Sequence, residues 1–91
     1  MNEEIVRKGR AAQTLLENPD FILIMDTVRL KAYRDWAKTE PSQVTTREEN
    51  YNLLRAIDAL TENLESLVAN ARFEEAKAER DQPQQQEEID D

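Results

Sequence analysis

Residues 46–80 form a stretch of 35 positions without a glycine or a proline. Its apolar side chains recur at spacings of 4, 3, 4, 3 and 4: Leu53, Ile57, Leu60, Leu64, Leu67 and Ala71. This spacing is typical of one long helix with a single apolar seam, because residues three and four positions apart lie on the same helix face. Such a seam has to be buried, either against another helix of the same chain or against a partner.

The composition favours an all-α fold. Among 91 residues there are only one Gly and three Pro, and helix-favouring residues such as Leu, Ala, Glu, Arg and Lys are abundant. The absence of Cys and His excludes thiol and imidazole catalysis, disulfides and ordinary zinc sites. We therefore predict no enzyme activity, no catalytic residues, no cofactor and no metal.

The chain lacks the apolar segments that membrane insertion requires. Its longest apolar run, residues 21–25, is far shorter than a membrane span. The start, Met1-Asn2-Glu3-Glu4, does not show the basic and then apolar order of a signal peptide. We expect a cytoplasmic protein without membrane contact.

The pattern predicts three helices, at about 3–17, 19–38 and 46–79, within a single helical domain that covers residues 1–80. From residue 81 onward, glutamines, a proline and acidic residues predominate, a composition that cannot form a core. Residues 81–91 are therefore predicted to be a disordered acidic C-terminal tail.

Capping residues support these boundaries. Asn18 can cap the second helix, and Pro19 suits its first position. Pro41 blocks helix continuation between the second and third helices. Two overlapping capping boxes precede the third helix: Thr45 with Glu48, and Thr46 with Glu49.

The short connection between the second and third helices predicts an antiparallel helical hairpin. We expect the seam residues Leu53, Ile57, Leu60 and Leu64 to pack against Phe21, Met25, Val28 and Trp36 of the second helix. A charge at Leu60 would then unfold the hairpin, since a buried site cannot solvate it.

The third helix is longer than the second, so the end of its seam needs another partner. The residues beyond the hairpin form a candidate protein interface: Leu67, Val68, Ala71 and Phe73. A charge at Leu67 is expected to dissociate an oligomer, unless the first helix covers this region. Trp36 has two interpretations, a core residue or an anchor for a partner protein.

The charged residues are unevenly distributed. Residues 74–91 hold eight acids and two bases, whereas residues 1–73 hold twelve acids and ten bases. The acidic tail either keeps the protein soluble or docks on a basic surface.

A candidate basic patch, which could contact phosphates, comprises Arg7, Lys8, Arg10, Arg29, Lys31, Arg34 and Lys38. Solvated surface charge is the alternative interpretation of this set.

A set of residues between positions 9 and 73 carries a resemblance to a known group of proteins. They are Gly9-Arg10-Ala11-Ala12, Leu15-Leu16, Asn18-Pro19-Asp20-Phe21, Tyr33, Trp36, Thr39, Arg47-Glu48, Tyr51, Leu54, Ala56-Ile57-Asp58-Ala59-Leu60 and Leu64. In this order the chain resembles small α-helical proteins that tailed bacteriophages and prophages encode near their virion-assembly genes. The resemblance implies a location in the bacterial host cytoplasm or on the virion, and it implies no catalytic residue.

The leading hypothesis is a non-enzymatic helical interaction protein, a scaffold- or connector-like accessory in phage virion assembly that acts through helix–helix contacts. Its partner would be a second copy of the chain or a virion protein. One alternative is a small phage regulator that binds and inhibits a host protein such as RNA polymerase. A further alternative is a DNA-packaging accessory that binds DNA through the basic residues.

Overall fold

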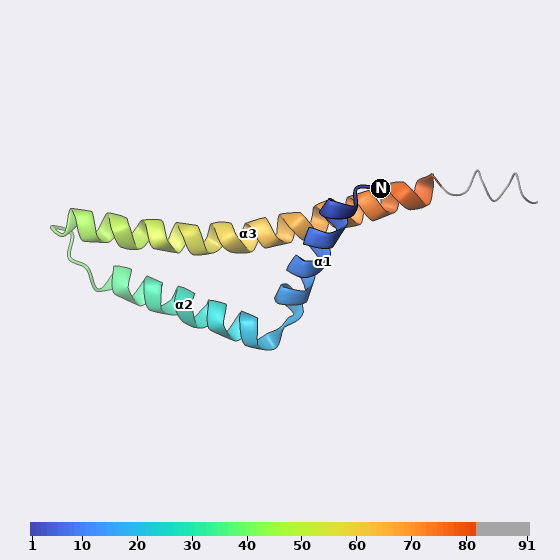
Figure 1. Ribbon diagram of the computed structural model, residues 1–91. Helices are drawn as coiled ribbons and strands as arrows, with labels where there is room; N and C mark the ends of the chain where they lie inside the picture. The colour runs from blue at the N-terminus through green and yellow to red at the C-terminus, as the bar shows by residue number, and fades with distance from the viewer. Residues whose placement is uncertain (82–91) are drawn as a thin grey trace, which may run out of the picture. The chain divides into compact units, whose positions relative to one another are not determined.

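The structure is a computed structural model that describes residues 1–81, and these residues form three α-helices and no strand (Figure 1). Helix α1 spans Glu3–Glu17, α2 spans Pro19–Ala37 and α3 spans Val44–Arg80. The prediction of an all-α chain is therefore confirmed. Of the predicted disordered tail, Asp81 lies in a turn after α3, and residues 82–91 lie outside the described residues.

The described chain divides into two compact units. Residues 1–14 and 64–81 form one, which we call the α1 unit, and residues 15–63 form the other, which we call the α2 unit. Helix α3 contributes its first part to the α2 unit and its last part to the α1 unit. The single domain over residues 1–80 stays a prediction.

Asparagine side chains cap the N-termini of both α1 and α2. The Oδ1 atom of Asn18 accepts hydrogen bonds from the backbone N–H groups of Asp20, at 2.9 Å, and Phe21, at 3.2 Å, and Pro19 follows as the first helical residue. The predicted cap of α2 is thus confirmed. Asn2 caps α1 in the same way, because its Oδ1 atom accepts from the N–H groups two and three residues later.

Helix α3 begins two residues earlier than the sequence predicts, at Val44. Residues 40–43 form a tight turn, in which the Gln43 N–H donates to the Glu40 carbonyl at 2.9 Å and the Glu40 N–H donates to Oε1 of Gln43 at 2.7 Å. The Arg47 N–H then donates to the Gln43 carbonyl, which makes Gln43 the residue that precedes the first turn of α3. Both threonines of the predicted capping boxes consequently lie inside the helix, and neither box starts it.

The α1 unit is held together by a close crossing of α1 and the end of α3. Its buried apolar side chains are Val6 and Ala12 of α1 and Val68 and Ala71 of α3. At the centre is Gly9: a Cβ atom added there would overlap the Cβ atom of Ala71. Small residues let two helix backbones approach closely, so the only glycine of the chain sits where the helices touch.

In the α2 unit, α2 lies beside the first part of α3 (Figure 1). Ala32 and Ile57 are buried apolar residues of this unit, at 3% and 7% exposure. The predicted packing of Leu53, Leu60 and Val28 buries them only in part, because about half of each residue remains exposed. Two helices touch along one line, and side chains that flank this line stay exposed until a further helix covers them.

Candidate protein-interaction surface

Helix α1 covers part of the predicted interface at the end of α3 and leaves the rest exposed. Val68 and Ala71 are buried inside the α1 unit, and the backbone carbonyl of Leu67 lies against Gly9. Phe73 remains 64% exposed. Of these four positions, Phe73 therefore offers the largest free side chain to another protein.

Trp36 is held by contacts inside the α2 unit. The guanidinium carbon of Arg47 lies 5.0 Å from its ring centroid, and the Tyr33 ring centroid lies 6.1 Å away. Arg47 is fixed in this position because its Nη1 atom donates to the carbonyl and the hydroxyl oxygens of Thr39, at 3.0 and 3.1 Å. Trp36 is half-buried, so part of the residue is still accessible to a partner.

The members of the predicted basic patch that belong to α1 face acidic neighbours. Arg7 and Lys8 both form ion pairs with Glu4, and Arg10 Nη2 lies 3.4 Å from Oε1 of Glu75. The hydrogen bond from Arg7 holds the pKa of Glu4 below its ordinary value, and the same bond raises the pKa of Arg7. These cations are therefore partly neutralised within the α1 unit.

Three basic-patch residues on α2 also have favourable interactions with their own helix: Lys31, Arg34 and Lys38. Lys31 Nζ donates to Oδ2 of Asp35 at 2.8 Å, a bond that lowers the pKa of Asp35 and raises that of Lys31. Arg34 lies in the last turn and Lys38 at the C-cap, where positive charge is favourable next to the negative end of the helix dipole.

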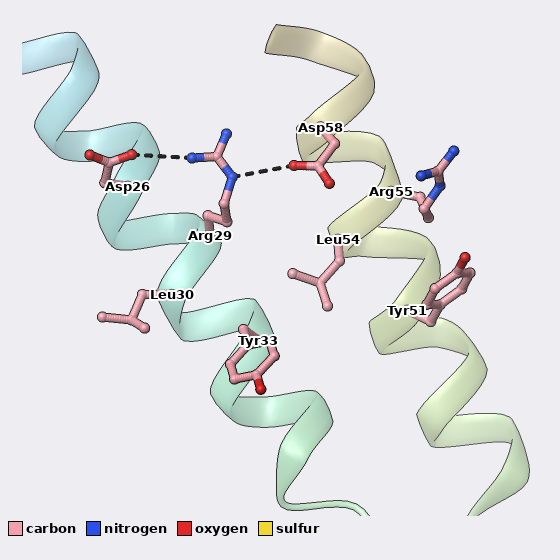
Figure 2. Close-up of a pocket in the computed structure, with 8 residues that line it drawn as sticks. All are labelled: Asp26, Arg29, Leu30, Tyr33, Tyr51, Leu54, Arg55 and Asp58. Atoms are coloured by element: carbon pink, nitrogen blue, oxygen red, sulfur yellow. Dashed lines mark hydrogen bonds and ion pairs between the residues drawn. The ribbon is translucent and has the colours of Figure 1, made fainter. Parts of the chain in front are cut away.

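The fourth α2 cation, Arg29, bridges the two helices of the α2 unit. It forms ion pairs with Asp26 on its own helix, at 3.1 Å, and with Asp58 on α3, at 3.3 Å, and Nη2 donates to the Thr61 hydroxyl at 3.2 Å. Figure 2 shows the guanidinium between the two carboxylates, with Leu54 extending from α3 toward α2. A pocket of about 530 Å³ lies on this side of the helix pair. We call this side the bridged edge.

The opposite flank of each helix carries apolar side chains. On α2, Val28 and Ile24 precede Arg29 by one and five residues. On α3, Leu60 precedes Thr61 by one residue, and Leu53 precedes Asp58 by five. At 3.6 residues per turn, an offset of one residue is a rotation of about 100° and an offset of five residues about 140°, so each of these side chains points away from the contact residue that follows it. Their exposures are 60% for Ile24, 44% for Val28, 51% for Leu53 and 49% for Leu60. We call these four residues the apolar edge.

Two features of this arrangement are not evident from the sequence. The first is Gly9, which is the contact point of the α1 unit. An isolated glycine within a helical pattern is the available signal, because such a residue costs helix stability and calls for a packing reason. The second is the exposure of Leu53 and Leu60, which belong to the same seam as the buried Ile57, so that periodicity alone does not separate exposed from buried positions.

Comparisons with protein families, with curated proteins and with solved structures find no match to this chain. Within residues 1–81, no helix combines the length and the apolar character needed to cross a membrane. The same residues contain no cluster of acidic side chains suited to hold a metal ion. The described residues of the α2 unit present exposed apolar side chains beside ion pairs.

Proposed function

We propose that this chain is a non-enzymatic helical interaction protein, and that its α2 unit is an antiparallel helical hairpin that binds another protein through helix–helix contacts. The observation that carries the proposal is the burial pattern. Ala32 and Ile57 are buried in this unit, while large apolar side chains stay exposed along both helices: Ile22, Leu23, Ile24, Val28, Leu30, Tyr33, Val44, Tyr51, Leu53 and Leu60. A helix that is apolar on several sides is normally covered on several sides.

The energetics favour a partner at this surface. Complete burial of a Val, Leu or Ile side chain contributes about 1.5–3 kcal/mol, so covering four half-exposed residues contributes about 3–6 kcal/mol. A hairpin with few buried side chains gains little stability from its own core. Binding and folding of the α2 unit would therefore support each other.

The virion-assembly role is the specific form of this proposal. The resemblance to small helical phage and prophage proteins supports it, and a scaffold- or connector-like accessory uses surface complementarity rather than catalysis. We place the protein in the cytoplasm of a bacterial host or on the assembling virion. Inhibition of a host protein such as RNA polymerase would use the same exposed surface with a different partner.

The ion pairs weigh against the DNA-packaging alternative. Phosphate contacts require cations that are free to replace counterions. Arg7, Arg10, Arg29 and Lys31 instead lie beside carboxylates of the protein. Protein binding through apolar side chains is the better supported function.

The proposal is tested by co-producing the chain with the products of the genes on either side of its own. A photo-crosslinking amino acid at Leu60 should join the chain to a virion structural protein or to a second copy. The matched control carries the same amino acid at Asn52, an exposed polar position of α3. If Leu60 gives no protein crosslink beyond that of Asn52, the proposed function is wrong.

A further inference from the structure

We propose that the bridged edge of the α2 unit binds an extended, proline-rich segment of a partner protein that carries one acidic and one basic residue. This inference goes beyond the proposed function, because the occupant is an extended chain and not a helix. The site is a groove made of two adjoining pockets, of about 530 and 290 Å³, which share Tyr51. The groove runs from Arg29 and Asp58 to Pro41 and Val44, at the connection between α2 and α3.

Three aromatic rings line this groove. Tyr33 and Tyr51 are 55% and 52% exposed, and Figure 2 shows them at neighbouring levels, one on each helix. Trp36 lines the second pocket, and its ring is held between Arg47, at 5.0 Å, and Tyr33, at 6.1 Å. Grooves lined by aromatic side chains are suited to polyproline II segments, because these segments are preformed and lose little conformational entropy on binding.

The polar groups of these rings favour an extended segment over a helix. Within residues 1–81, the hydroxyl groups of Tyr33 and Tyr51 and the indole N–H of Trp36 donate to no protein acceptor. The backbone carbonyls of a partner helix are occupied by its own hydrogen bonds. A polyproline II segment has no internal hydrogen bonds, so its carbonyls are free to accept from all three donors.

The unpaired charges of the groove define the charges of the occupant. Arg29 is already shared between Asp26 and Asp58. Arg55 in the first pocket and Glu48 in the second form no ion pair in the described part of the chain. They are seven residues apart on α3, about 10 Å, a distance that about three polyproline II residues span. An acidic and a basic residue three positions apart would therefore meet Arg55 and Glu48 at the same time.

The test is a titration of the full chain, up to about 1 mM, into a fluorescein-labelled peptide, followed by fluorescence anisotropy. The peptide has about seven residues, which in polyproline II form cover the roughly 21 Å from Val44 to Asp58. It consists of prolines with one aspartate and one lysine three positions apart, and both orders of the two charges are measured. The control peptide keeps both charges and has alanine in place of every proline. We expect at least one order to bind with a Kd of about 10 µM to 1 mM, and the alanine peptide to bind at least about 10-fold more weakly.

Substitutions in the groove locate the binding site. Tyr51→Ala should weaken binding at least about 10-fold, and Arg55→Gln should weaken it about threefold and reduce its salt dependence. If Tyr51→Ala loses helicity in circular dichroism, Tyr51→Phe takes its place, and loss of the hydroxyl donor should weaken binding about threefold. The matched control is Phe73→Ala, which removes an aromatic side chain of 64% exposure outside the α2 unit and should leave binding unchanged.

The outcomes separate this inference from the proposed function. The proline-rich site is overturned if neither peptide order binds, if the alanine peptide binds equally well, or if the Tyr51 variants bind like the wild type. The crosslink at Leu60 reports on the apolar edge, on the opposite flank. A Leu60 crosslink to a protein beside a failed titration would overturn the groove alone and leave the proposed function in place.

Discussion

Gly9→Ala is the substitution that tests the packing of the α1 unit most severely. Alanine favours an isolated helix over glycine, so helix propensity alone predicts a gain of about 1 kcal/mol. The structure predicts the opposite sign. The new Cβ atom would overlap the Cβ atom of Ala71 and lie 2.6 Å from the backbone carbonyl oxygen of Leu67, where 3.4–4 Å is ordinary contact.

The size of the destabilisation depends on which atoms the new Cβ atom overlaps. A backbone carbonyl and a Cβ atom within a helix cannot rotate aside, so α1 and α3 have to separate by about 1 Å, a degree of overpacking that costs about 1–3 kcal/mol. Separation also loosens the contacts of the buried residues Val6 and Val68. After subtraction of the propensity gain of about 1 kcal/mol, we expect a net destabilisation of up to about 2 kcal/mol.

Hydrogen exchange measured by mass spectrometry on the peptide that covers residues 1–14 is the suitable assay, because Trp36 lies in the α2 unit and does not report on α1. The expected exchange is faster than in the wild type by up to about 30-fold. Ala11→Gly at an exposed site of α1 measures propensity alone, and adding Ala71→Gly to Gly9→Ala should restore part of the protection. Unchanged or slower exchange in Gly9→Ala would refute the close crossing.

Three further predictions concern single contacts. Asn18→Ala should lower the free energy of unfolding by about 1 kcal/mol through loss of the α2 cap, and Asn18→Asp should retain most of it, as urea titrations can check. Arg47→Ala should shift the fluorescence of Trp36 and destabilise the connection by about 1 kcal/mol, with Arg47→Lys intermediate; an unchanged spectrum would contradict the stacking. In Arg7→Gln the lowered pKa of Glu4 should return toward 4.5, as followed by NMR titration of the carboxyl group. Because the folded pKa is lowered, this ion pair contributes stability above pH 4.5 and loses it as the pH falls through the folded value.

Local signals in the sequence predicted the helices well. The Asn18-Pro19 pair specifies the start of α2 through a side-chain acceptor and a fixed φ angle, and both act without tertiary contacts. The sequence predicts too late a start for α3, because two threonines followed by glutamates imitate a capping box. The turn at residues 40–43 closes through both the backbone and the side chain of Gln43, and so begins the helix earlier.

The candidate site was harder to predict, since periodicity identifies the apolar face of a helix but not how many side chains of that face another helix buries. Leu53, Ile57 and Leu60 share one seam, yet only Ile57 is buried within the chain. Likewise, Val68 and Ala71 look unpartnered from the lengths of the helices, and a single glycine in α1 lets that helix cover them. Which residues are core and which are free depends on helix contacts that no local pattern encodes.

The far-UV circular dichroism of Leu60→Asp, recorded beside that of Ile57→Asp, tests the central claim most directly. The two positions belong to one seam, and their exposures are 49% and 7%. Our account predicts that Ile57→Asp loses much of the helical signal because it buries a charge, whereas Leu60→Asp retains it because its side chain reaches solvent. Equal loss of helicity in both variants would contradict the account, since Leu60 would then belong to the core and not to a docking surface.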